Sequence, residues 1–219
     1  MIKLNNISFG YDSTSPLLLK DINLEISKGT YISVVGENGS CKTTLIKLIL
    51  GLLTPISGSI ELDTNKLAYV PQRVDNFNTD FPISVLEILK THAKALKLDI
   101  KSSIDLALEK VNMKHFKNSL IGNLSGGQQQ RIFIARALMG NPDLIILDEP
   151  STGVDYKNQQ EIYSILNKIN KNLGTTIISI EHNMEMALKY SSHILKIENG
   201  NLTLKSNEEF KDGIPLEGA

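Results

Sequence analysis

Apolar and polar residues alternate at the start of the chain, and this alternation predicts a pair of strands. A period of two is typical of strands that bury one face. Residues 12–16 are expected to form the turn between the two strands. The apolar positions that set the pattern are Ile2, Leu4, Ile7, Phe9, Leu17, Leu19, Ile22, Leu24 and Ile26.

Uninterrupted apolar runs further along the chain predict strands that are buried on both faces. These runs are residues 31–35, 144–147 and 176–180. Shorter strands are expected near residues 59–62 and 67–70. Residues 194–197 and 202–204 flank Asn199-Gly200, a dipeptide that favours a hairpin turn.

Helices are expected between several of these strands. Residues 43–52 are mostly apolar and contain no Gly or Pro until their end, so they predict a helix. Residues 84–113 place apolar side chains on one helical face, and residues 158–170 predict a further helix. Strands that alternate with helices favour an α/β fold whose sheet has a parallel core.

One long helical stretch, residues 81–137, interrupts the alternation of strands and helices. We expect it to be a subdomain inserted into a core that is built from residues 1–80 and 138–219. The expected fold class is therefore α/β, with a mixed sheet and an inserted α-helical subdomain.

Composition and charge narrow the possible classes of protein. The 219 residues are 41% hydrophobic and carry a formal net charge of −1, so nothing marks the chain as a binder of nucleic acid or of a charged membrane surface. The single cysteine, Cys41, cannot form an internal disulfide, which fits a reducing cytosol. The longest apolar stretch, residues 45–53, is interrupted by Lys47 and Gly51 and is too short to span a bilayer. Residues 1–5 lack the apolar region of a signal peptide.

A glycine-rich segment between a buried strand and a helix gives the first chemical signal. It reads Gly36-Glu37-Asn38-Gly39-Ser40-Cys41-Lys42-Thr43-Thr44 and is similar to the P-loop pattern G-x-x-x-x-G-K-[ST], with cysteine in place of the second glycine. Backbone N–H groups of such a loop surround a nucleotide phosphate. Lys42 would reach the β- and γ-phosphates, and the Thr43 hydroxyl would bind Mg²⁺. An ordinary glycine-rich turn is the alternative for this motif taken alone.

Two carboxylates follow the buried strand at residues 144–147. Asp148 and Glu149 would lie at the carboxyl end of that strand, where α/β sheets bind ligands. Asp148 would hold Mg²⁺ through water, and Glu149 would polarise an attacking water. A solvated strand end also often carries acids, but its pairing with a P-loop favours a nucleotide site.

The segment Leu124-Ser125-Gly126-Gly127-Gln128 decides the family resemblance. L-S-G-G-Q after a P-loop, and before an apolar run that ends in Asp-Glu, resembles the signature of ABC ATPases. The Ser125 hydroxyl and the N–H groups at Gly126 and Gly127 would form an anion site at a helix N-terminus. The resemblance implies that Ser125 to Gln128 face the γ-phosphate bound by a second subunit. It also implies a P-loop NTPase fold, with a parallel core and antiparallel N-terminal strands in the sheet and the signature on the helical subdomain.

Further motifs of the family follow in order along the chain. Tyr11 matches the aromatic residue that stacks on adenine, and Gln72 matches a glutamine that senses Mg²⁺ and the attacking water. Residues 151–155 match the D-loop, with Asp155 at the dimer seam. His182 matches the histidine that contacts the γ-phosphate, although Glu181-His182-Asn183 stands where the family has T-H-D.

The resemblance also implies cofactors, partners and a location. The expected cofactors are ATP and Mg²⁺, with Thr43, Gln72 and Asp148 around the metal. The expected assembly is a head-to-tail homodimer on an integral membrane permease, at the cytoplasmic face of the cell membrane. An extracellular solute-binding protein would take part indirectly, and nucleic acid is not expected.

The cargo is indicated by residues 68–85, which read A-Y-V-P-Q-R-V-D-N-F-N-T-D-F-P-I-S-V. This phrase resembles the branch of the family that serves zinc and manganese importers, and an iron chelate is the alternative cargo. A non-transport ABC ATPase, as in DNA repair or translation, usually has a long coiled coil or two cassettes, and this chain has neither. A P-loop kinase or GTPase is disfavoured because L-S-G-G-Q has no function there.

Cys41 is the one departure from the P-loop pattern. If its position requires a positive φ, the side chain costs about 1–2 kcal/mol, and we expect that cost to weaken nucleotide binding. Its thiol lies at a helix N-terminus beside Lys42, and both features favour a reactive thiolate.

Overall fold

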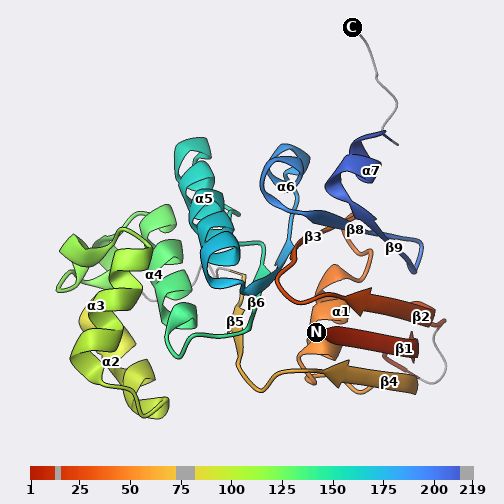
Figure 1. The fold of residues 1–219 in the computed structure, drawn as a ribbon, viewed down its shortest axis with the longest axis horizontal. Helices are drawn as coiled ribbons and strands as arrows, with labels where there is room; N and C mark the ends of the chain where they lie inside the picture. Colours follow the sequence, from red (N-terminus) through yellow and green to blue (C-terminus); the bar gives the residue numbers. More distant parts are fainter. Residues whose placement is uncertain (13–15, 73–81, 213–219) are drawn as a thin grey trace, which may run out of the picture.

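The strands are divided between two sheets in the computed structural model, which describes residues 1–12, 16–72 and 82–212 (Figure 1). The smaller sheet is antiparallel and has the order β2-β1-β4. Its strands are β1 (Ile2–Phe9), β2 (Leu19–Ile26) and β4 (Ser57–Leu62). Leu4 pairs with Leu24, so the alternating apolar residues share one face and confirm the predicted strand pair. These three strands form a sheet that is separate from the larger sheet. The larger sheet is the one that the alternation of strands and helices predicts.

The larger sheet has six strands in the order β5-β6-β7-β3-β8-β9. Its strands are β3 (Tyr31–Val35), β5 (Leu67–Val70), β6 (Leu144–Asp148), β7 (Thr176–Ile180), β8 (His193–Glu198) and β9 (Asn201–Ser206). The strands from β5 to β8 are parallel, and β9 is antiparallel to β8. Asn199 and Gly200 have φ values of 49° and 76°, which confirms the expected hairpin turn.

Seven α-helices and two short 3₁₀-helices accompany the strands of the described part of the chain. They are α1 (Lys42–Ile49), α2 (Val85–Ala95), α3 (Ile100–Lys110), η1 (Lys114–Phe116), η2 (Ile121–Asn123), α4 (Gly126–Leu138), α5 (Tyr156–Leu173), α6 (Met184–Tyr190) and α7 (Asn207–Asp212). Helix α1 ends three residues before the predicted end, and α5 extends beyond its predicted range at both ends. Helices α6 and α7 are not predicted by the apolar pattern.

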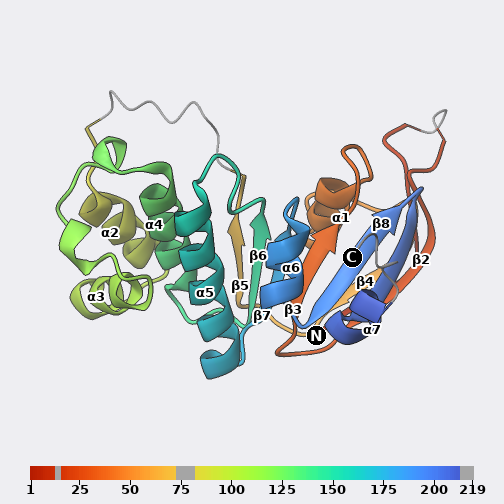
Figure 2. The ribbon, with the colours of Figure 1, turned by 90° about the horizontal axis from the view of Figure 1, so that it is seen from above.

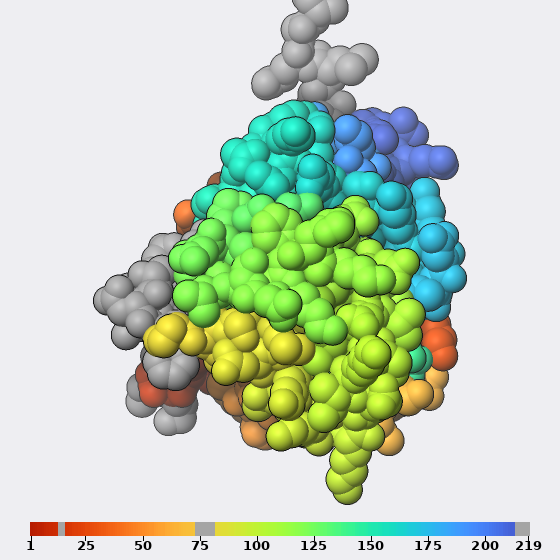
Figure 3. Space-filling model, turned by 90° about the vertical axis from the view of Figure 1, so that its left-hand side faces the viewer, coloured from red at the N-terminus to blue at the C-terminus, as the bar shows by residue number. Residues whose placement is uncertain are grey.

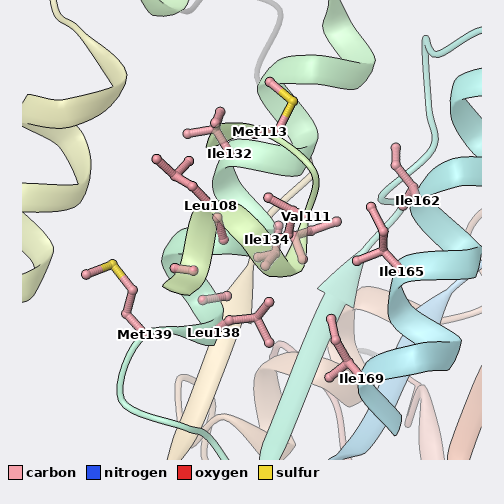
Figure 4. Packing of buried hydrophobic residues seen from close by; sticks show 14 of the residues in the cluster. Leu108, Val111, Met113, Ile132, Ile134, Leu138, Met139, Ile162, Ile165 and Ile169 are labelled. Atoms are coloured by element: carbon pink, nitrogen blue, oxygen red, sulfur yellow. The ribbon is translucent and has the colours of Figure 1, made fainter. Parts of the chain in front are cut away.

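Apolar side chains cover both faces of the larger sheet. One core lies between the two sheets and includes Leu45 and Ile46 of α1. The other core joins α2, α3, α4 and α5 to the opposite face of the larger sheet. Figure 4 shows side chains of α3, α4 and α5 meeting in this second core. Helices α2, α3 and α4 lie together at one end of the molecule, and they form most of the face seen in Figure 3.

Candidate functional site

The glycine-rich loop connects β3 to α1 and has little room for side chains at its start. A Cβ on Gly36 would lie 2.4 Å from the carbonyl oxygen of Ile197 and 2.6 Å from the Ser40 hydroxyl, so only glycine fits. Lys42 is buried, and its Nζ donates to the carbonyl oxygens of Gly36 and Glu37, both at 2.8 Å. Burial lowers the pKa of Lys42, while the charges of Glu149 and Asp148 act against that shift. The loop therefore holds the Lys42 ammonium group against its own carbonyl oxygens.

Cys41 immediately precedes α1 and has a left-handed backbone with φ of 74°. The position therefore favours glycine, as the P-loop pattern has it. Burial raises the pKa of the Cys41 thiol, which acts against the reactive thiolate that the sequence predicts. The thiol is partly covered by protein, and this desolvation opposes the charged form.

Asp148 ends β6 with an unsatisfied carboxylate oxygen. The residue is 5% exposed, and its Oδ1 is buried with no hydrogen-bond partner among the described residues. The Tyr69 hydroxyl donates to the other oxygen, Oδ2, at 3.4 Å. Burial and the neighbouring charge of Glu149 raise the pKa of Asp148. A buried carboxylate oxygen without a donor fits a divalent cation, which prefers oxygen ligands.

Glu149 is held by one side chain of its own turn and by side chains from two other segments. The Gln72 amide donates to its carboxylate at 2.6 Å, and the Thr152 hydroxyl donates at 2.9 Å. His182 Nε2 lies 2.6 Å from Glu149 Oε1. Burial acts to raise the pKa of Glu149, but hydrogen bonds from His182 and Thr152 and nearby positive charge outweigh it and lower that pKa. Glu149 is therefore a carboxylate at neutral pH.

This cluster brings together three residues that the sequence singles out separately. Gln72, Glu149 and His182 come from the ends of β5, β6 and β7, which are neighbours in the parallel sheet. Thr152 is a fourth member that the sequence analysis does not assign to the carboxylate. Its position three residues after Glu149, in the turn that leaves β6, is the signal that could have indicated it.

The segment Ser125 to Gln128 forms the first turn of α4 and is stabilised within its own chain. Ser125 Oγ accepts from the Gln128 N–H at 3.4 Å, and Gln128 Oε1 accepts from the Ser125 N–H at 2.9 Å. This capping box fixes the N-terminus of α4. A Cβ on Gly127 would lie 2.7 Å from the Cβ of Asn158, so this glycine lets α4 approach α5 closely.

The structure does not bring this segment to the P-loop of the same chain. A cavity of about 770 Å³ lies beside the P-loop and is lined by Gly36 to Cys41, by His182 and by the hairpin residues Glu198 to Gly200. Among the described residues that line it, none belongs to Ser125 to Gln128. Figure 2 shows α4 beside α2 and α3, while α1 lies across the strands β6 and β7 from them.

Comparison with known proteins decides the family. The family described as ABC transporter matches residues 19–152, which is more than half of the chain. The chain belongs to the ABC transporter family. The site described above places the P-loop lysine, Lys42, near the charges of Asp148 at the end of β6 and of Glu149.

Individual relatives match almost the whole chain. A probable metal transport system ATP-binding protein of Treponema pallidum is 40% identical, over 95% of this chain and 87% of the relative. The zinc uptake system ATP-binding protein ZurA of Listeria innocua is 38% identical, over 90% of this chain and 82% of the relative. The dimeric post-hydrolysis structure of the ATP-binding cassette MJ0796, bound to ADP and Pi, has a TM-score of 0.78 and 27% identity, over 94% of this chain and 99% of that one.

The remaining residues singled out from the family resemblance lie near the P-loop or at helix starts. The Tyr11 hydroxyl is 3.2 Å from Thr44 Oγ1, and its ring contacts Phe9 edge to face, with centroids 5.2 Å apart. Tyr11 is 60% exposed beside the P-loop helix. Asp155 precedes α5 and caps it, because its side chain accepts from the Asn158 N–H at 3.1 Å.

Two further observations concern the sequence phrase that indicates the cargo and the possibility of membrane-spanning helices. Residues 73–81, which carry most of the phrase resembling zinc and manganese importers, lie outside the described residues. Within the described ranges, no helix has the length and apolar character needed to cross a membrane.

Proposed function

We propose that this chain is the ATP-hydrolysing subunit of an ABC transporter that imports a divalent metal ion, zinc or manganese, through a separate permease. The observation that carries the ATPase assignment is the arrangement around Glu149. A carboxylate with a lowered pKa is held by Gln72 and His182 at the same sheet edge as the P-loop lysine.

The proposed chemistry is hydrolysis of the γ-phosphate by a water that Glu149 orients. The loop N–H groups and Lys42 would bind the phosphates, and Tyr11 would stack on the adenine. Thr43, Gln72 and Asp148 would hold Mg²⁺, which supplies charge neutralisation on the phosphates when bound. Glu149 would accept a proton from the attacking water. His182 would contact the γ-phosphate from its position against Glu149.

A second subunit is needed to complete this site. Ser125 to Gln128 begin α4 on the far side of the sheet from their own P-loop, so a head-to-tail partner would supply them with a phosphate to bind. The relative MJ0796 is dimeric, which supports this arrangement. We propose Asp155 at the seam of the dimer and residues 81–137 as the subdomain that carries the signature.

The names of the relatives support the proposed cargo, and the remaining partners are inferred from the family resemblance. The Treponema relative is named for metal transport and the Listeria relative for zinc uptake. An integral membrane permease would provide the pathway, with an extracellular solute-binding protein acting on its other side. The chain would then lie at the cytoplasmic face of the membrane as a peripheral subunit.

The ATPase proposal is tested with Glu149→Gln. This change keeps the shape of the side chain and removes its basicity, so we expect ATP binding to persist and hydrolysis to fall by ~10²–10⁴-fold. Glu25→Gln is the matched control, because Glu25 is an exposed carboxylate that pairs only with Lys3 on β1 among the described residues. Near-normal turnover in Glu149→Gln would show that another group activates the water.

The cargo proposal is tested in cells that lack the chain. We expect lower cellular zinc or manganese, and growth that is restored when the missing metal is added. Iron should be measured in the same cells. Altered iron with unchanged zinc and manganese would contradict the proposed cargo and leave the ATPase assignment intact.

A further inference from the structure

Glu181 is a buried carboxyl group directly before His182, and the proposed chemistry does not use it. The residue is 2% exposed and follows the last residue of β7. Both carboxylate oxygens have a hydroxyl donor. Ser179 Oγ donates to Oε1, and the Tyr163 hydroxyl donates to Oε2. The Glu181 N–H donates to the carbonyl oxygen of Val34, at 2.9 Å, and so ties the strand end to β3.

Tyr163 extends this contact to the turn after β6. Its hydroxyl lies 2.7 Å from Ser151 Oγ, and both residues are buried. The Tyr163 ring stacks on Tyr190 of α6, with centroids 5.7 Å apart and planes 15° apart, so α6 helps to hold the Tyr163 side chain in place. Ser151, Tyr163 and Glu181 thereby connect three segments that are distant in sequence.

The two ends of this connection are the direct neighbours of the residues that hold Glu149. Ser151 is next to Thr152, whose hydroxyl donates to Glu149, and Glu181 is next to His182, which contacts the same carboxylate. A closed ring results, with Glu149 on its exposed side. Displacing Ser151 relative to Glu181 would therefore change how Thr152 and His182 meet Glu149.

We propose that Glu181 and Tyr163 are positioning residues for ATP hydrolysis, which set the Ser151 turn against the His182 strand end and so fix Glu149 between Thr152 and His182. The proposal rests on the proposed ATPase function. It assigns a use to the departure from T-H-D, because Glu181 presents two separate oxygens, one to Ser179 and one to Tyr163, whereas a threonine has a single hydroxyl oxygen.

The surroundings of Glu181 are hydroxyl groups and a neighbouring carboxylate. Tyr31 of β3, Tyr163 of α5, Tyr190 at the end of α6 and Glu149 are the titratable groups whose charges couple within this cluster. Burial raises the pKa of Glu181 to about 7, and hydrogen bonds from Ser179 and Tyr163 limit that rise. The two hydroxyl donors compensate in part for the lost hydration.

The test is steady-state ATP hydrolysis by the full chain with Tyr163→Phe, which removes one hydroxyl and keeps the ring that stacks on Tyr190. We expect kcat to fall by about 10–100-fold while KM for ATP stays nearly unchanged, because the loss is in orientation and not in binding. Tyr190→Phe is the matched control. It removes a hydroxyl from the stacked ring without touching Ser151 or Glu181, and we expect wild-type kcat.

A double-mutant cycle separates positioning from a general loss of stability. Ser151→Ala and Tyr163→Phe remove opposite ends of one hydrogen bond, so the double variant should be no slower than the worse single variant. Glu181→Gln should show the same selective fall in kcat. Additive losses of kcat, or normal kcat in a folded but less stable Tyr163→Phe, would overturn the proposal. If the wild-type chain itself hydrolyses no ATP, the proposed function fails instead.

Discussion

Cys41 and Glu149 both lie on left-handed backbone, with φ values of 74° and 48°. This conformation costs a residue with a Cβ about 1–2 kcal/mol. The angle at Cys41 belongs to the folded chain itself, so its cost reduces the free energy of unfolding. The expectation that it would weaken nucleotide binding is therefore replaced by an expected effect on stability.

Cys41→Gly should stabilise the protein. Removing the strained side chain gains about 1–2 kcal/mol, and the greater freedom of glycine in the unfolded chain offsets part of it, so we expect a net gain of about 0.5–1 kcal/mol. Urea unfolding measures this gain, and ATP affinity should not change. Cys41→Ala removes the thiol but keeps the Cβ, so it should show no gain. Tighter ATP binding by Cys41→Gly without added stability would contradict this account.

Glu181 predicts a pH dependence of stability. Its pKa in the folded chain is about 7, above the ordinary value of 4.5. The folded state therefore holds the proton more tightly, and this contribution is complete below pH 4.5 and lost as pH rises to about 7. The loss amounts to about 3 kcal/mol. Urea unfolding measures the free energy of unfolding at pH 5 and at pH 8. The change in this free energy between the two pH values should be smaller in Glu181→Gln than in wild type, and an identical change would contradict the prediction.

At the scale of elements, the first turn of α4 packs closely against α5. A Cβ at Gly127 would meet the Cβ of Asn158, which is an atom that cannot swing away. Both helix starts are capped by their own residues, Ser125 for α4 and Asp155 for α5. The signature glycine is thus also a packing residue, which its sequence motif does not reveal.

Gly127→Ala should lower the free energy of unfolding by about 1–3 kcal/mol, because the added methyl overpacks this contact. Asn158→Gly removes the opposing Cβ and serves as the background for a second measurement. In that background the alanine should cost much less, which chemical denaturation will show. An equal cost in both backgrounds would mean that the two helices do not meet at this point.

The sequence predicts those elements whose apolar pattern is long and regular, and the sheet strands are the clearest case. The end of α1 is missed because residues 50–52 continue the apolar run, while Gly51 has φ of 69° and leaves the helix. Helix α7 follows a capping box between Ser206 and Glu209, a local signal that the apolar pattern does not contain. Helix α6 is only seven residues long and has a cap at Asn183.

The candidate site also has a part that the sequence predicts and a part that it does not. Gln72, Glu149 and His182 could be named from motifs, and the neighbouring positions of their strands bring them together. The contacts of Glu181 with Tyr163 and Ser151 could not be predicted. They join residues of three segments, and no pattern within any one segment indicates the other two.

At the scale of the molecule, the P-loop and the start of α4 face different neighbours, and a second chain would unite them. We expect a mixture of Lys42→Ala and Ser125→Ala chains to hydrolyse ATP at up to about a quarter of the wild-type rate, because mixed dimers contain one intact composite site. Each variant alone should be nearly inactive. A mixture no faster than the two variants measured separately would rule out the shared site.

Helices α2, α3 and α4 share one apolar core with the larger sheet, and this limits how the chain can be divided into fragments. Val85 and Leu89 of α2 belong to the same buried cluster as Ile145 and Leu147 of β6. A fragment limited to residues 81–137 would expose that apolar face, and the remaining sheet would expose its counterpart. The segment that interrupts the α/β alternation is therefore not a transplantable module. An engineer who wished to exchange it would have to redesign one face of the sheet along with it.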